Sequence, residues 1–248
     1  MKLYGLGGIG TGKLGNQVFA VKSGQQIVRQ YQPIVTNPNT PAQVETRSKM
    51  KLMSQVAAVV APAIAIAPVA NKTKRNLFIS RNYGEITYND DTAAIQLSRM
   101  QLTKGTLAFV GVSAAATEQN KISVSLSEQP TEDIDKVAYS IVRQNNEGGL
   151  SFVESKVVDR DENGTFPYTS QSTIFTGNRY TVLAYGIRLN SERAALKLGQ
   201  LNAPTAENVA KIVSSRALSD SDITLTQTTG ASFIAEEGPA QPEGPVNP

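Results

Sequence analysis

Three residue types are missing from this chain of 248 residues: histidine, cysteine and tryptophan. Histidine is the common proton shuttle near neutral pH, and cysteine supplies thiolate nucleophiles and soft metal ligands. Their absence excludes Ser-His-Asp and Cys-His catalysis and any disulfide framework. We therefore predict a non-enzymatic protein without cofactor or metal, in which only two carboxylates brought into one cleft would support hydrolysis.

The sequence also lacks long apolar runs. Its main uncharged stretch, residues 54–70, is rich in alanine and interrupted by Pro62 and Pro68, whereas a membrane-spanning helix takes about 20 strongly apolar residues. Residues 1–5 lead straight into glycines, without the apolar core of a signal peptide. We expect no membrane span, no classical secretion and synthesis in the cytoplasm.

Charge is divided unevenly along the chain. Of its 24 bases and 21 acids, residues 1–84 hold eleven bases and one acid, Glu45, for a net charge of +10, which leaves −7 for residues 85–248. Such a basic half contacts nucleic acid or an acidic protein surface. Because the bases are scattered and lack interleaved aromatics, we favour pairing between the basic half of one subunit and the acidic half of its neighbour.

The candidate contact residues for assembly or for nucleic acid are eight bases of the first half: Lys13, Arg29, Arg47, Lys49, Lys51, Lys72, Lys74 and Arg75. A helix is predicted to begin at Thr40 and Pro41, and Arg47 and Lys51 lie opposite its apolar arc. Lys49 falls inside that arc, where its ammonium must snorkel, meet a carboxylate or project beyond the core.

The periodicity of the apolar residues predicts an α+β fold that is mainly β. Residues 1–118 are expected to form a β-hairpin and helices, including an Ala-rich helix after Pro62. From Ile122 apolar residues alternate with period two between turn signals, which indicates half-buried antiparallel strands and an immunoglobulin-like β-sandwich over residues 119–202. Residues 203–248 are expected to add a short helix, a strand and a Pro-rich extended tail.

Three motifs point to ligand sites, but each departs from its pattern. Residues 5–10 read G-x-G-x-x-G without a preceding strand, and residues 7–13 resemble a phosphate loop in which Leu14 replaces the magnesium-binding Ser or Thr. The segment from Asp159 to Gly164 matches the start of a calcium loop, yet Ser170 stands where the bidentate Glu belongs. We favour a flexible glycine-rich arm or hairpin and an acidic hairpin turn, and leave open whether that turn binds an ion.

Three stretches carry a resemblance to a known family: Gly12-Lys13-Leu14-Gly15-Asn16 with Ile27-Val28-Arg29, Thr40-Pro41-Ala42-Gln43 with Arg47-Ser48-Lys49-Met50, and Leu102-Thr103-Lys104-Gly105-Thr106-Leu107. They resemble an uncharacterised family from Bacteroidetes and their phages, whose members share a G-K-L-G-N hairpin, a T-x-A-Q helix start, an S-K-G-x-L segment and a β-rich C-terminal domain. The resemblance spans about residues 12–201. It implies no activity.

The chain also looks similar to virion structural proteins of crAss-like bacteriophages. This resemblance implies a ring or collar protein of the portal-tail (head-tail) assembly. Such a protein forms a homo-oligomeric ring that contacts portal, tail or capsid subunits. Whether the ring also contacts packaged DNA is left open. Extended segments at both ends fit that role, because such arms order as they wrap neighbouring subunits. The alternatives are a capsid auxiliary or nucleic-acid-binding protein that uses the basic half, and a surface adhesive module.

Overall fold

The computed structural model describes residues 11–22, 25–32, 39–69, 71–130, 134–201, 205–236 and 238–239. The chain divides into two compact units, which meet between Val44 and Glu45. Outside the described residues lie the G-x-G-x-x-G motif and the tail from residue 240 onward.

The first unit contains a three-stranded antiparallel sheet, called here the N-terminal sheet, with strands β1 (Gly12–Leu14), β2 (Gln17–Lys22) and β3 (Gln25–Gln30) in that order. This confirms the predicted hairpin and adds a strand to it. Gly15 and Asn16 form the two-residue turn between β1 and β2, and the φ of +55° at Gly15 is a conformation that favours glycine. The G-K-L-G-N motif is therefore a strand followed by its turn.

The described residues form four longer helices, of which α1 begins in the first unit and continues into the second. They are α1 (Pro41–Val59), α2 (Lys74–Asn82), α3 (Glu192–Gly199) and α4 (Ala206–Ser214). α1 begins where Thr40 and Pro41 predict, and α4 begins after Thr205, whose side chain accepts a hydrogen bond from the N–H of Asn208. Short 3₁₀ turns occupy Ala61–Ala63, Tyr83–Glu85 and Leu97–Arg99.

The prediction of an Ala-rich helix after Pro62 is wrong. The chain leaves the 3₁₀ turn at Ala63 and runs extended, and the N–H of Ala65 donates to the carbonyl of Leu102 at 2.9 Å. Ile64, Ala65 and Ile66 are all buried. Because Pro62 sits in this turn and Pro68 follows six residues later, no uninterrupted helical run remains between them.

The second unit has two larger sheets and a hairpin. The five-stranded sheet has the order β12 (Ile223–Leu225), β11 (Arg179–Leu189), β8 (Lys136–Gln144), β9 (Leu150–Asp159), with β13 (Thr229–Ile234) also paired to β11. The three-stranded sheet has the order β10 (Tyr168–Thr169), β7 (Ile122–Leu126), β6 (Val112–Ala116). The hairpin is β4 (Ile86–Asn89) with β5 (Thr92–Ile95).

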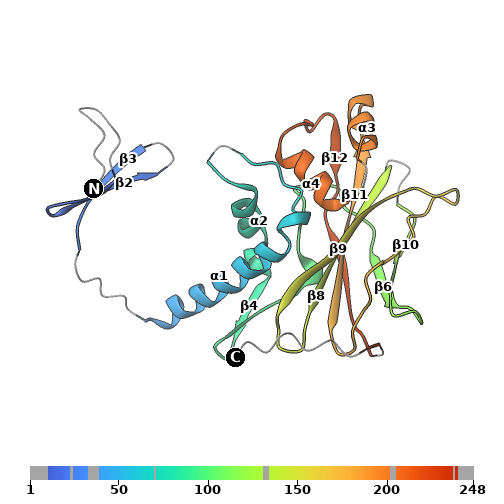
Figure 1. Ribbon diagram of the computed structural model, residues 1–248, viewed down its shortest axis with the longest axis horizontal. Helices are drawn as coiled ribbons and strands as arrows, with labels where there is room; N and C mark the ends of the chain where they lie inside the picture. The colour runs from blue at the N-terminus through green and yellow to red at the C-terminus, as the bar shows by residue number, and fades with distance from the viewer. Residues whose placement is uncertain are drawn as a thin grey trace. The chain divides into compact units, whose positions relative to one another are not determined.

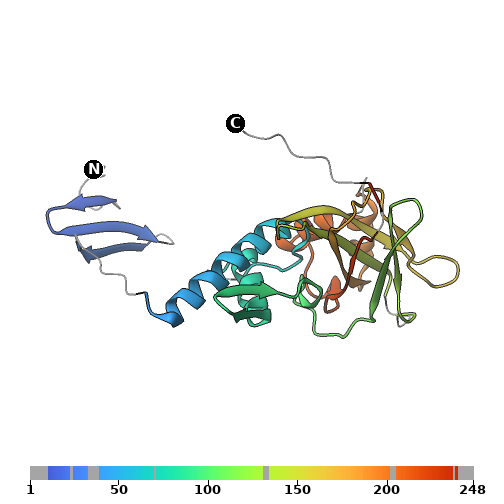
Figure 2. The ribbon, with the colours of Figure 1, turned by 90° about the horizontal axis from the view of Figure 1, so that it is seen from below.

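These elements form three layers, with the five-stranded sheet in the middle. One of its faces, which includes Ala138 and Leu183, shares a core with α1, α2 and α4. The other, which includes Tyr139 and Val182, shares a second core with β7. Figures 1 and 2 show α1, α2 and α4 on one side of β8, β9 and β11, and β6 and β10 on the other. β8 and β11 are therefore buried on both faces, which corrects the expectation of half-buried strands; β7 alternates as predicted.

The α+β, mainly β, prediction is confirmed, but the expected divisions at residues 118 and 202 do not coincide with the observed one. β6 pairs with β7 across the first boundary, and β12 and β13 pair with β11 across the second. Residues 119–202 consequently do not complete either sheet alone. The immunoglobulin-like arrangement is not confirmed, since helices cover the sheet face that a two-layer sandwich leaves exposed.

No helix in the described part of the chain is long and apolar enough to cross a membrane.

Candidate assembly interface

The N-terminal sheet has two faces of different chemistry. Strand register places Lys13 opposite Val18 and Val18 opposite Arg29, so these three side chains lie in one row on one face. Tyr31 lies on the same face, with its ring centroid 3.4 Å from the Lys13 ammonium. We call this side the basic face; it brings two of the eight candidate bases together.

The opposite side, the uncharged face, carries apolar and amide side chains. Register places Leu14 opposite Gln17, Phe19 opposite Val28 and Val21 opposite Gln26. Leu14 is 53% exposed, Val28 50% and Val21 39%. Neither buried core of the protein includes a described residue of this sheet. Apolar side chains thus gather on one face without a core of their own.

The first unit also has an extreme charge composition. Residues 1–44 contain three lysines and one arginine and no acidic residue, since Glu45 is the first acid of the chain. The remaining 204 residues hold 20 bases and 21 acids. The bases of residues 1–44 therefore have no acidic residue within that segment to pair with. Their ionic partners must come from beyond residue 44 or from another molecule.

Three further candidate bases lie on α1. Arg47 and Lys51 are exposed, as their place opposite the apolar arc predicts. Lys49 is partly buried, and its ammonium lies 2.6 Å from the Glu45 carboxylate one helical turn earlier. We expected the Lys49 ammonium to snorkel, to meet a carboxylate or to project beyond the core, and the structure shows that it meets a carboxylate.

The remaining three bases lie at the start of α2. Lys74 donates to the carbonyl of Ala61 at 3.5 Å, and Arg75 donates to the carbonyl of Ser54 at 3.3 Å, which ties α2 to α1 and its 3₁₀ extension. Lys72 precedes the helix and is exposed. Lys74 and Arg75 therefore have a structural explanation that the sequence pattern did not reveal.

The acidic turn after β9 uses a carboxylate to hold its own backbone. Asp161 accepts hydrogen bonds from the hydroxyl and N–H of Thr165, at 2.7 and 2.6 Å, and from the N–H of Asn163 at 3.0 Å. These donors, the Thr165 hydroxyl first, lower the pKa of Asp161. No group of three acidic side chains suited to a metal occurs among the described residues. A turn does form here, in which the N–H of Gly164 donates to the carbonyl of Asp161 at 3.0 Å, but it is not a hairpin turn, since β9 pairs with β8 and β10 pairs with β7.

Glu154 of β9 is the most extensively bonded carboxylate in the described chain. It accepts from the hydroxyls of Tyr168 at 2.6 Å and Ser172 at 2.7 Å, and from the N–H groups of Gln171 and Ser172. Both oxygens accept from donors of residues 168–172, which comprise β10 and the loop that follows it. Glu154 consequently serves to join that loop to the sheet, and it is poorly placed to act as a general base.

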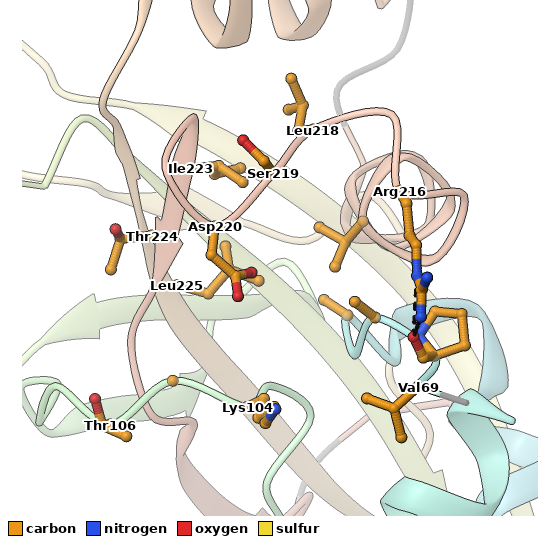
Figure 3. A pocket seen from close by; sticks show the side chains of 15 residues that line it. Val69, Lys104, Thr106, Arg216, Leu218, Ser219, Asp220, Ile223, Thr224 and Leu225 are labelled. Atoms are coloured by element: carbon orange, nitrogen blue, oxygen red, sulfur yellow. Dashed lines mark hydrogen bonds between the residues drawn. The ribbon is translucent and has the colours of Figure 1, made fainter. Parts of the chain in front are cut away.

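A groove of about 560 Å³ lies beside β12 (Figure 3). Apolar side chains such as Val69 and Leu225 line it, together with the charged groups of Lys104, Arg216 and Asp220. Figure 3 shows the Arg216 guanidinium hydrogen-bonded at one wall, where its Nε lies 3.1 Å from the carbonyl oxygen of Pro68. The groove is an open depression with both signs of charge on its walls.

The Leu102–Leu107 segment of the family resemblance forms part of this wall and locks β12 in place. The Thr103 hydroxyl donates to the carbonyl of Thr226 at 2.5 Å, and Gly105 lies so close that an added Cβ would be 2.0 Å from the carbonyl oxygen of Leu225. Only glycine fits here without a shift of the backbone. The motif thus has a packing role.

Sequence reasoning missed the uncharged face. Its signal was present, because Phe19 and Val21 alternate with the residues of the other face along β2. What the sequence did not give was the pairing of β2 with both neighbours, which brings Leu14 and Val28 to the same side.

Comparison with protein-family models and with curated proteins finds no match for this chain.

Proposed function

We propose that the chain is a non-enzymatic structural component of a bacteriophage virion, a ring or collar protein of the head-tail assembly. The observation that carries the proposal is the N-terminal sheet, which exposes apolar side chains on one face and positive charge on the other. A monomeric protein gains nothing from such a surface, whereas a subunit of an assembly uses it as a contact. The resemblance to virion structural proteins of crAss-like bacteriophages supports the same role.

The edge of the N-terminal sheet suits it to a contact between subunits. β3 is the last strand in the order β1-β2-β3, so its outer edge has no partner strand among the described residues. Exposed edges of this kind pair with strands of other chains. The basic face then meets a neighbouring surface rich in carboxylates, such as the net acidic part of the chain after residue 84.

The proposal is tested by mass spectrometry of purified phage particles from a culture that expresses the chain, together with the solution mass of the purified full-length protein. We expect the protein in particles, and a discrete oligomer that weakens at high salt because basic and acidic surfaces hold it. A monomer under all conditions that is also missing from particles would contradict the proposal.

A second candidate function is nucleic-acid binding through the basic face. The observation that favours it is the contact between Lys13 and Tyr31, since an aromatic ring beside cations is typical of single-strand binding surfaces. Replacement of Lys13 and Arg29 by alanine is then expected to reduce both the affinity for DNA and the salt dependence of binding. Replacement of Lys74 and Arg75 serves as the control, because these side chains bond the carbonyls of Ala61 and Ser54.

A further inference from the structure

We infer that the uncharged face of the N-terminal sheet binds the same face of a second copy of this chain. Two such sheets then stack into a small sandwich with the basic faces outward. This inference rests on the proposed assembly role and names one contact of that assembly.

The first argument is the separation of charge by the strand register. The cations of Lys13 and Arg29 lie on one face, whereas the opposite face offers Leu14, Phe19, Val28 and neighbouring residues without any charged side chain. Two copies that approached through their basic faces would repel each other, since residues 1–44 contain no acid to offset the cations. Approach through the uncharged faces carries no such penalty and places the cations on the outside.

The second argument is the lack of a better apolar partner on the described surface. Nine large apolar side chains are exposed there, and three of them, Leu14, Val21 and Val28, lie on this one face. The exposed apolar residues of the second unit come one each from five separate segments: Met50, Val69, Leu107, Leu196 and Ile234. The groove beside β12 carries the charged groups of Lys104, Arg216 and Asp220 on its walls, which suits an uncharged face poorly. The uncharged face therefore matches its own copy best.

The third argument is the stability of small sheets. A sheet with one apolar face is stable once that face is covered, and two stacked sheets are one of the common solutions. A twofold axis through the uncharged face makes the contact self-complementary, because each copy presents the same residues. Phe19, which is partly buried, lies opposite Val28 near the middle of the face and supplies the largest apolar side chain.

The matched test uses two adjacent residues of β3 that lie on opposite faces. Val28 is 50% exposed on the uncharged face, and Ile27 is 43% exposed on the basic face. The chain contains no cysteine, so Val28→Cys and Ile27→Cys each introduce a single thiol into the full-length protein. Stacked sheets pack about 10 Å apart, a distance that a short bis-maleimide bridges.

We expect the Val28→Cys protein to give a cross-linked dimer at least about tenfold faster than the Ile27→Cys protein at equal concentration. In parallel and at high salt, where pairing of the basic face with acidic surfaces is screened, Val28→Glu is expected to weaken self-association at least about tenfold, because it buries an unpaired carboxylate. Ile27→Glu is expected to leave self-association unchanged under the same conditions. Self-association through the uncharged face should also survive high salt, unlike pairing between basic and acidic surfaces.

Equal cross-linking from both positions, faster cross-linking from Ile27→Cys, or no cross-linking from either would overturn the inference. Should the wild-type protein form oligomers while both glutamate variants associate as it does, the assembly role stands and the stacked-sheet contact fails. A wild-type protein that is monomeric at every concentration overturns the contact, and its absence from phage particles would then remove the proposed function as well.

Discussion

Two tyrosines in neighbouring strands of the five-stranded sheet differ in what their hydroxyl groups meet. Both side chains are fully buried, which raises the pKa of each phenol. The hydroxyl of Tyr139 donates to the carbonyl of Phe166 at 2.6 Å, whereas the hydroxyl of Tyr185 has no hydrogen-bond partner among the described residues. Burial of a hydroxyl without a partner costs desolvation free energy that no hydrogen bond offsets.

We therefore predict opposite effects of removing the two hydroxyls. Tyr139→Phe leaves the carbonyl of Phe166 unsatisfied and should lower the free energy of unfolding by about 1–2 kcal/mol. Tyr185→Phe should leave it unchanged or raise it by about 1 kcal/mol. Chemical denaturation of the two variants beside the wild-type protein measures both effects. Equal losses in the two variants would show that the environment of Tyr185 has been misjudged.

Gly105 is the residue at which packing is least tolerant. Since an added Cβ would meet the backbone of Leu225 and Thr226, Gly105→Ala should shift this backbone and lower the free energy of unfolding by about 2 kcal/mol. Gly84→Ala is the control, because nothing lies within 4 Å of a Cβ at that position. Thermal unfolding of the two variants measures the difference. A Gly105→Ala protein as stable as Gly84→Ala would rule out that close packing at Gly105 holds β12 in place.

At the scale of elements, one carboxylate joins the start of α3 to the turn that leads into β12. Asp222 accepts from the N–H and hydroxyl of Ser219 and from the hydroxyl of Ser191, the residue that caps α3. These donors, the Ser219 N–H first, lower the pKa of Asp222 to about 2. The same junction holds β12 at the edge of the five-stranded sheet.

A pH dependence follows from the lowered pKa of Asp222. A folded-state pKa below the unfolded value means that the stabilisation is complete above about pH 4 and is lost as the pH falls towards 2. The midpoint of urea unfolding should therefore fall between pH 5 and pH 2.5, and Asp222→Asn should flatten this decline. Asp220→Asn, a change at an exposed neighbour in the same loop, should leave the slope as in the wild type. A slope unaffected by Asp222→Asn would contradict the assignment.

Elements with strong local signals were predictable from the sequence. β7, β8 and β11 follow from their period-two patterns, and α1 and α4 from capping residues and prolines. α3 was missed although its start signal is local, since the Ser191 side chain caps the helix by accepting from the N–H of Ala194. β13 was missed because it contains Gly230, which packs against the backbone of Ser98. The burial of both faces of β8 was equally hidden, since it requires knowing that helices cover the sheet.

For the candidate site, the sequence showed which part of the chain holds the bases, but not how their side chains are arranged in space. It identified Lys13 and Arg29, and strand register then placed them on the same face of the N-terminal sheet, with Val18 between them. It also grouped Lys74 and Arg75 with them, although these two side chains bond carbonyls of α1 and its 3₁₀ extension. The position of a base along the chain does not reveal what its side chain meets, because that depends on residues far away in the sequence.

At the scale of the whole molecule, the two units differ in what they contain. The second unit contains both buried cores and holds its layers together through β11. The first unit contributes no described residue of 11–32 to either core, yet it carries the uncharged face and a stretch of chain without acids. Such a surface is the reason for which we propose association between subunits.

The measurement that tests this account most directly is the light-scattering mass of the full-length protein across a wide concentration range, with Val28→Glu and Ile27→Glu beside the wild type. We predict that the wild-type protein and Ile27→Glu have masses that are multiples of the 26.5 kDa chain and that Val28→Glu shifts towards the monomer. A wild-type protein that stays at 26.5 kDa at every concentration would contradict the account.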